Sequence, residues 1–196
     1  MDKYPRFRAV EDNRTPPTGR EPSYRATVTL SVQLFLERYN MGASIHDILS
    51  ELRSVAYDER DKGDRFERLM QSYLTVEPQY AQLYSDVWMW TDYPNRGVRK
   101  DTGIDLVARA RDTGELTAIQ CKFFDPATTV TKPMLDSFLA ASSKNFDGQP
   151  EFLARVVIST SDSWGSNAED AVENQNPPVQ RLRVQDLDES SIDWAQ

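Results

Sequence analysis

The sequence has 196 residues, one of them a cysteine, with 39% hydrophobic residues and a formal net charge of −8. This length suits a single domain, one cysteine excludes an intramolecular disulfide framework, and the lack of a long apolar run or an apolar start leads us to expect a cytoplasmic protein with no membrane partner. An acidic chain also argues against strong autonomous binding of nucleic acid, because neutralising phosphates requires a basic face.

The amino-terminal part divides into a segment without periodicity and a helical segment. Residues 1–28 are rich in Pro, Arg and Thr and are interpreted as a flexible leader. Apolar residues at helical spacing predict two helices within residues 29–60, the second of them capped by Ser44. A third helix is predicted after the charged stretch 58–64, and Glu67 lies beside its apolar stripe.

The rest of the chain alternates between β-forming runs and amphipathic runs. The predicted elements are, in chain order, a strand at 86–91, a hairpin of strands at 103–108 and 118–124, a helix at 131–142, a strand at 152–159, a short helix opened by a capping box at Ser166, and a strand at 181–184. This order predicts an α/β core over residues 61–185, with a mixed central sheet flanked by helices. The acidic residues 186–196 are interpreted as a linker.

The predicted hairpin carries three polar side chains among apolar neighbours. Side chains alternate across a strand, so Gln120 and Lys122 share one face, and Asp105 on the adjacent strand can meet them at one rim. A polar group buried without a partner destabilises the fold by about 1–3 kcal/mol. Three polar side chains in such apolar strands therefore indicate a functional role. The alternative is a surface hairpin with ordinary polar faces.

The three residue types suit metal-assisted hydrolysis of a phosphodiester. A carboxylate from Asp105 and an amide oxygen from Gln120 are ligands that Mg²⁺ accepts, and the ammonium of Lys122 can orient water and offset developing charge. Glu67 could add a second carboxylate through metal-bound water; the alternative is a solvated helix residue. One cysteine and one histidine exclude a zinc site.

Asp105 with Gln120-x-Lys122, in this element order, resembles the PD-(D/E)xK nuclease superfamily in its Mrr-like form, where Gln replaces an acid. The resemblance implies a restriction-endonuclease-like fold, Mg²⁺ binding by the Asp and Gln positions, and assistance of the nucleophile by the Lys. Mn²⁺ is expected to substitute for Mg²⁺. The chain departs from the family pattern at Ile104, where a proline normally precedes the Asp.

A second resemblance extends from about residue 44 to residue 194 and involves the amino-terminal nuclease domain of Type ISP restriction-modification enzymes. The runs that carry it are SIHDIL, DKGDRFERLMQSYL, SDVWMW, DTGIDLVA, AIQCKFFDP, STSDSWGSNAE and DLDESSIDW. It implies cleavage of double-stranded DNA in a restriction or phage-defence system, with helicase-like ATPase and methyltransferase domains as partners. Residues 1–43 fall outside the match, and residues 186–196 would lead toward the helicase-like domain.

Further side chains are candidates for DNA contacts. Ser159 and Thr160 follow a buried strand and could bind a phosphate, although a loop leading into a helix is the alternative. Lys132 and Lys144 flank the helix after the hairpin and could also touch DNA, whereas charged helix ends are usually only solvated. For the chain as a whole, the alternatives are a non-catalytic interaction module with a nuclease fold and a nuclease acting on RNA or on particular DNA structures.

Overall fold

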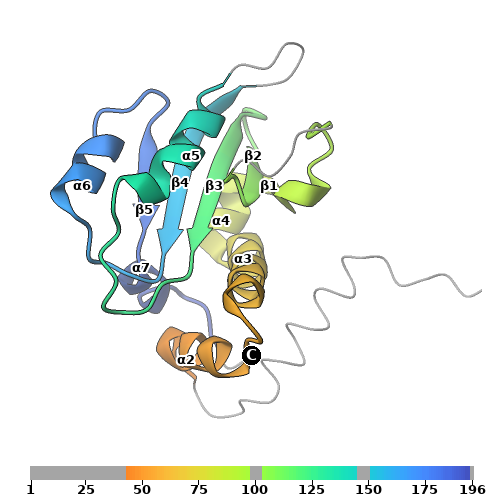
Figure 1. The fold of residues 1–196 in the computed structure, drawn as a ribbon. Coiled ribbons are helices and arrows are strands. Elements are labelled where there is room, and N and C mark those ends of the chain that lie inside the picture. The colour runs from red at the N-terminus through yellow and green to blue at the C-terminus, as the bar shows by residue number, and fades with distance from the viewer. Residues whose placement is uncertain (1–42, 98–102, 145–150, 195–196) are drawn as a thin grey trace, which may run out of the picture.

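The computed structural model describes residues 43–97, 103–144 and 151–194 and contains a five-stranded mixed sheet with the order β1-β2-β3-β4-β5 (Figure 1). The strands are β1 (Tyr84–Met89), β2 (Leu106–Ala110), β3 (Leu116–Lys122), β4 (Phe152–Ser159) and β5 (Val179–Leu182). The pairs β1–β2 and β2–β3 are antiparallel, whereas β3–β4 and β4–β5 are parallel. The leader and the first amino-terminal helix expected from the sequence lie outside the described residues.

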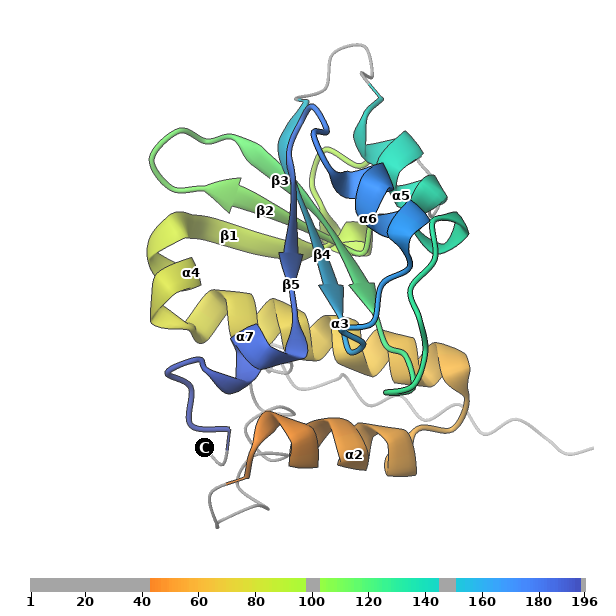
Figure 2. The ribbon, with the colours of Figure 1, turned by 90° about the vertical axis from the view of Figure 1, so that its left-hand side faces the viewer.

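Helices cover both faces of the sheet. They are α2 (Ile45–Val55), α3 (Glu59–Val76), α4 (Pro78–Leu83), the 3₁₀ turn η1 (Trp90–Asp92), α5 (Pro133–Ser142), α6 (Ser166–Val172) and α7 (Val184–Asp188). The helices α5 and α6 lie on one side, and α3 and α7 lie on the other (Figure 2). Within the described ranges, none of these helices combines the length and hydropathy needed to cross a bilayer.

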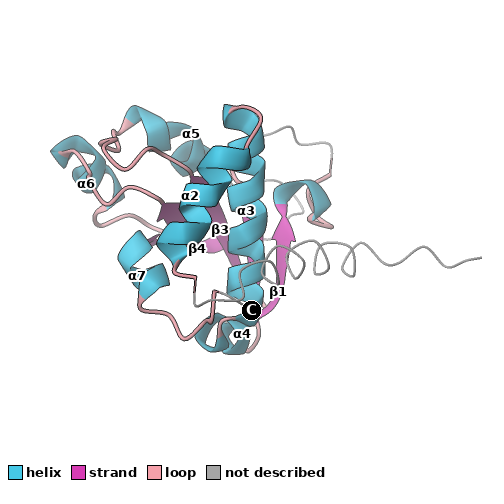
Figure 3. Ribbon diagram, turned by 90° about the horizontal axis from the view of Figure 1, so that it is seen from below, coloured by secondary structure: helices cyan, strands magenta, loops and turns pink. Residues whose placement is uncertain are grey.

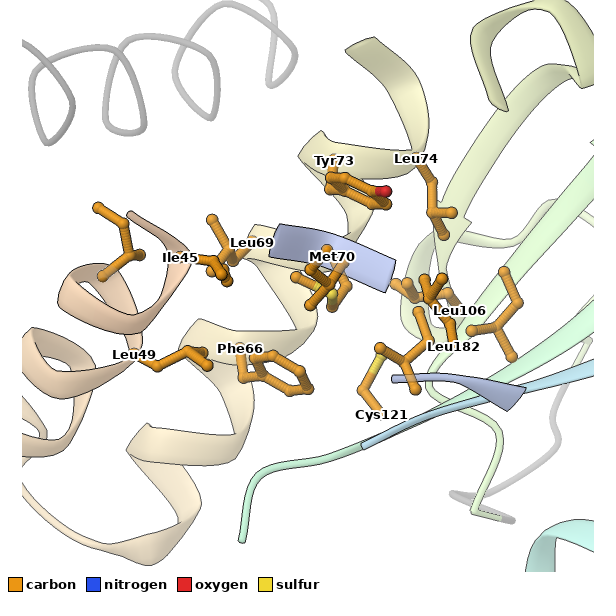
Figure 4. Packing of buried hydrophobic residues seen from close by; sticks show 14 of the residues in the cluster. Ile45, Leu49, Phe66, Leu69, Met70, Tyr73, Leu74, Leu106, Cys121 and Leu182 are labelled. Carbon is orange, nitrogen blue, oxygen red and sulfur yellow. The ribbon is translucent and has the colours of Figure 1, made fainter. Parts of the chain in front are cut away.

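The helix α2 runs beside α3 on the side away from the sheet (Figure 3). Its start agrees with the prediction, because the Ser44 hydroxyl caps the first turn and the Asp47 carboxylate accepts a hydrogen bond from the Ser44 amide at 2.9 Å. The apolar face of α2 is buried against α3, whose own apolar residues reach the sheet at Leu106 and Cys121 (Figure 4). This packing connects the amino-terminal helices to the hairpin.

The hairpin of β2 and β3 forms as predicted, and its two strands are antiparallel. Leu106 pairs with Ile119, and the turn ends at Gly114, whose φ of +73° is readily adopted only by glycine. The regular strand begins at Leu106, so Asp105 precedes β2 instead of lying within it. Regular alternation would place Ile104 on the same face of the sheet as Leu106. Because the regular strand begins only at Leu106, Ile104 instead packs with Val107 on the other face.

Several predicted boundaries are wrong because tertiary contacts set them. The strand predicted at 86–91 ends at Met89, since Trp90 enters η1 and is buried. The capping box at Ser166 is absent; Gly165 holds the N-cap position without a side-chain bond. The last strand lies at Val179–Leu182, where it pairs with β4, instead of at 181–184.

The acidic carboxyl-terminal segment is folded onto the core through Trp194. Residues Val184–Asp188 form α7, and Leu187 is fully buried. The Trp194 ring stacks on Tyr73 of α3, with 5.6 Å between ring centroids and 5° between their planes. The described part of this segment, up to Trp194, thus packs on the core, and the role of residues 186–196 as an acidic linker stays a prediction.

Candidate active site at the end of the hairpin

Asp105 is held where β2 begins and β3 ends. Its amide donates to the Ile119 carbonyl at 2.9 Å, and its carbonyl accepts from the Trp90 amide at 2.7 Å. Its carboxylate oxygen Oδ2 accepts from the Cys121 amide at 2.7 Å, which is the length of a charge-assisted bond. The Asp105 carboxylate is thus fixed against the main chain of the residue that separates Gln120 from Lys122.

Gln120 is fully buried beside Asp105. Its amide nitrogen Nε2 donates to the Gly103 carbonyl at 3.1 Å. Because a carbonyl can only accept, this bond fixes the orientation of the Gln120 amide, with the oxygen Oε1 on the other side. The oxygen Oε1 is buried and has no hydrogen-bond partner in the described structure. A buried acceptor left in this way is costly, so the site favours a donor or a cation at Oε1.

Lys122 is the last residue of β3 and is half-buried, opposite Ser159 of β4. Its carbonyl accepts from the Thr160 amide at 3.0 Å, which fixes the main chain at the carboxyl end of the strand. Because Lys122 and Gln120 are two residues apart on one strand, their side chains leave the same face. The structure therefore brings Asp105, Gln120 and Lys122 together at one end of the sheet.

Glu67 of α3 lies close to this group, half-buried on the helix that packs against β3. The pKa of the Cys121 thiol shows which charged groups lie near it. Burial raises the pKa of the Cys121 thiol, the carboxylates of Asp105 and Glu67 raise it further, and Lys122 lowers it. Asp105, Glu67 and Lys122 thus lie near enough to shift the pKa of one buried thiol, which is a poor nucleophile at neutral pH.

The donor set fits a hard cation. Within the described ranges, no three His, Cys, Asp or Glu side chains gather closely enough to hold a metal ion by themselves. A cation here would depend on the Asp105 carboxylate, the unpartnered Gln120 oxygen and water, with Glu67 acting from α3. Such a set suits Mg²⁺, which prefers oxygen and keeps several waters.

The two hydroxyl residues after β4 are buried and bonded within the chain. The Ser159 hydroxyl donates to the Ser161 carbonyl at 2.9 Å, and the Thr160 hydroxyl accepts from the Phe124 amide at 2.7 Å. Both residues are at most 5% exposed. This geometry favours the alternative of a structural loop leading into a helix, and DNA contact by these hydroxyls stays a prediction.

The lysines at the ends of α5 are both exposed. Lys132 pairs with Asp136 one turn further along, at 2.5 Å, and Lys144 follows the C-cap Ser143. An exposed pair of this kind contributes little to stability, so Lys132 stays available to a partner. Neither position conflicts with a DNA contact, which stays a prediction.

Gly103 is a site residue that the sequence placed only at the start of a predicted strand. Its φ of +80° lies in the region that favours glycine, and a Cβ built there would meet the Ser137 hydroxyl of α5 at 2.8 Å and the Phe138 amide nitrogen at 3.4 Å. Its carbonyl orients Gln120. The close approach to α5 is a tertiary contact, so the local sequence contains no signal for it.

We expect Gly103→Ala to destabilise the fold by about 1–3 kcal/mol, because it combines backbone strain with a clash against α5. Gly114→Ala is the matched control, since its φ is +73° but nothing lies within 4 Å of the added Cβ. Urea denaturation should show the larger loss for Gly103→Ala. Adding Ser137→Ala should recover part of that difference, and equal losses at the two glycines would contradict the packing described.

Comparison with known proteins gives one family match. The family model described as "Restriction endonuclease" (Mrr_cat_2) matches residues 75–196. No curated protein sequence matches the chain. The family match includes the whole hairpin and therefore Asp105, Gln120 and Lys122, whereas α2 and most of α3 precede it.

Comparison with solved structures gives three restriction enzymes. The ATP-dependent Type ISP restriction-modification enzyme LlaBIII, solved bound to DNA, is similar with a TM-score of 0.63 and 30% identity over 79% of this chain. The restriction endonuclease MspJI, in complex with a 27-mer oligonucleotide, and the DNA modification-dependent restriction endonuclease AspBHI each share 16% identity, with TM-scores of 0.43 and 0.45 over 93% and 88% of this chain. The chain spans only 9%, 35% and 38% of these three proteins, respectively.

Proposed function

The chain belongs to the restriction endonuclease family, and from this premise we propose that it is a Mg²⁺-dependent endonuclease domain that cleaves DNA phosphodiester bonds. Its fold is the restriction-endonuclease-like α/β fold expected from the sequence. The observation that carries the proposal is the junction of Asp105, Gln120 and Lys122 at one end of the hairpin.

Each residue of the junction has a chemical task. Bound Mg²⁺ would polarise the phosphoryl oxygen and acidify the attacking water. Asp105, fixed by the Cys121 amide, supplies the negative charge that holds the cation, and Gln120 supplies a neutral oxygen oriented by Gly103. Lys122 orients the water and offsets the charge that builds on the phosphoryl group. Mn²⁺, which accepts the same oxygen ligands, substitutes for Mg²⁺.

The similarity to a Type ISP enzyme supports a place for this chain in a larger restriction machine that acts in phage defence. The matched enzyme is ATP-dependent and bound to DNA in its structure, and this chain corresponds to 9% of it. We propose that helicase-like ATPase and methyltransferase domains, in the same polypeptide or as neighbours, bring double-stranded DNA to the site. The net charge of −8 supports this division of tasks, because an acidic chain attracts DNA weakly.

The alternative of a non-catalytic interaction module has less support from the described residues. It would gain from apolar surface on residues 28–56 that the core does not use. In α2 the four apolar residues of the inward face are buried, and exposed apolar surface is confined to Val55 and the following Tyr57. The buried, unpartnered oxygen of Gln120 has no use in a purely structural hairpin, which favours the nuclease.

A plasmid-nicking assay tests the proposed function. The isolated 196-residue chain should nick supercoiled DNA slowly and without sequence preference when Mg²⁺ or Mn²⁺ is present, and EDTA should abolish the activity. Double-stranded RNA and branched DNA, assayed in parallel, separate this proposal from a nuclease for RNA or for particular DNA structures. No cleavage under any of these conditions, and no metal binding by calorimetry with DNA present, would favour the interaction module.

We expect Lys122→Met to lower the nicking rate by about 10²-fold or more, because removal of one group that stabilises the transition state typically has this effect. The methionine keeps the length of the apolar stem, so the end of β3 should stay packed. Arg60→Ala, on the exposed side of α3, removes one positive charge and should retain wild-type activity. A full nicking rate in Lys122→Met would remove Lys122 from the site.

A further inference from the structure

A guanidinium group from α2 reaches the main chain immediately after Lys122. Arg53 lies in the last turn of α2, and its Nη2 donates to the Phe124 carbonyl at 3.3 Å. The same guanidinium carbon lies 4.8 Å from the centre of the Phe123 ring, within the range of a cation–π contact. Arg53 therefore contacts both residues that follow the end of β3.

The same two residues are held from the other sides. The Phe124 amide and carbonyl both bond to the Thr160 hydroxyl, at 2.7 and 2.8 Å. The Phe123 ring meets Phe66 of α3 edge-on, with 5.4 Å between centroids, and the Lys62 ammonium lies 5.9 Å from its centre. Residues 123–124 are half-buried and are thus contacted by groups from α2, α3 and the end of β4.

The burial of part of the Arg53 guanidinium supports a structural role for this side chain. Its Nε is buried and has no hydrogen-bond partner in the described structure, so the side chain accepts a desolvation cost to place its Nη2 on Phe124. An arginine that served only solubility would extend into water, as long cationic side chains usually do. The helix that carries Arg53 precedes residues 75–196, which the family model matches.

We propose that Arg53 is a positioning residue that holds the end of β3 so that the Lys122 ammonium points at the reacting phosphate, an inference that rests on the nuclease function proposed above. Arg53 is assigned to the main chain and not to DNA, because its Nη2 donor and its cationic face are both directed at residues 123–124. Small displacements of a catalytic group are costly, about 10²-fold for roughly 1 Å. Docking of α2 is thereby coupled to the geometry of the site.

The test compares Arg53→Ala, Arg53→Lys and a matched control, Arg65→Ala, which removes an exposed arginine of α3 that pairs with Asp61 one turn earlier. Nicking rates at saturating DNA and Mg²⁺ should fall about tenfold or more in Arg53→Ala and stay unchanged in Arg65→Ala. Arg53→Lys should give an intermediate rate, since an ammonium keeps the charge but not the planar fork. Thermal unfolding identifies any variant that is not folded at the assay temperature.

Two further measurements separate positioning from other roles. The apparent affinity for DNA and its salt dependence should be the same in Arg53→Ala and wild type, whereas loss of a phosphate contact would reduce the salt slope by about one. Hydrogen exchange should accelerate at the Phe124 amide in Arg53→Ala while the amides of β4 stay protected. This last readout needs no catalysis.

The outcomes are distinguishable. Wild-type inactivity with every metal would defeat the nuclease proposal, and hydrogen exchange at Phe124 would still decide whether Arg53 holds the strand end. An active wild type with a full rate in Arg53→Ala would overturn the positioning role alone. A reduced salt slope, or an equal loss in Arg65→Ala, would overturn it as well.

Discussion

Replacing Asp105 by asparagine is expected to abolish metal-dependent cleavage while leaving the fold in place. Asparagine keeps the size of the side chain and an oxygen that can accept from the Cys121 amide, so the bond that now measures 2.7 Å can persist in neutral form. The change from a charged to a neutral acceptor costs about 1 kcal/mol of stability. It removes the negative charge that pairs with the cation.

The loss of activity should be large because Gln120 cannot compensate for it. A glutamine contributes a neutral oxygen, so Asp105 is the one carboxylate among Asp105, Gln120 and Lys122, with Glu67 acting from α3. We expect nicking to fall by about 10³-fold or more, the upper end of the effect of losing one electrostatic group. Calorimetry in the presence of DNA should show a matching loss of Mg²⁺ binding.

A nearby acid provides the control for this prediction. Asp125 is exposed in the loop that follows β3, and Asp125→Asn removes the same charge without touching the hairpin. It should cleave at the wild-type rate, or slightly faster if the lower negative charge helps DNA to approach. If Asp105→Asn nicks DNA as well as Asp125→Asn does, Asp105 is not a ligand of the cation.

The hairpin could be predicted because its determinants are local. The turn Asp112-Thr113-Gly114 and two flanking apolar runs define an antiparallel pair, and that pairing brings Asp105 beside Gln120. The buried strand Phe152–Ser159 could also be predicted, since β-branched residues gather in a short run. The element order and the candidate trio therefore followed from periodicity and turn chemistry alone.

What could not be predicted depends on contacts between distant segments. The stacking of Trp194 on Tyr73 joins residues more than 100 positions apart, so the acidic composition around Trp194 gave no sign that this residue packs on the core. The support of Gln120 by Gly103, and of the strand end by Arg53, likewise requires the folded arrangement. Residue type and spacing indicated which groups could act, whereas the groups that hold them appeared only in three dimensions.

Arg155 is the clearest case of a determinant hidden from sequence reasoning. It stands in the middle of the apolar strand β4 and is fully buried, although arginine is rarely found in such a place. Its guanidinium donates through Nε to the Pro177 carbonyl at 3.1 Å and through Nη1 to the Ser143 hydroxyl at 2.9 Å. A third bond reaches the Gln175 side chain at 3.3 Å. These acceptors belong to the end of α5 and to the segment before β5.

We expect Arg155→Ala to destabilise the protein by about 3–5 kcal/mol, because it leaves buried acceptors without a donor and opens a cavity. For a chain of this size the melting temperature should fall by about 10 °C. Arg155→Lys should recover part of the loss, since one ammonium reaches some of the acceptors but cannot span them all. Arg65→Ala again serves as control, with an exposed ion pair that contributes less than about 1 kcal/mol.

The result would also show whether the elements on the two faces of the sheet unfold together. The contacts of Arg155 join α5 to the loop before β5, and β5 leads into α7, which packs under α3 and α2. If the ends of α5 and β5 loosen together, urea unfolding of Arg155→Ala should stay a single transition with a lower midpoint. An unchanged midpoint would mean that water satisfies the same acceptors, and Arg155 would then be dispensable for the fold.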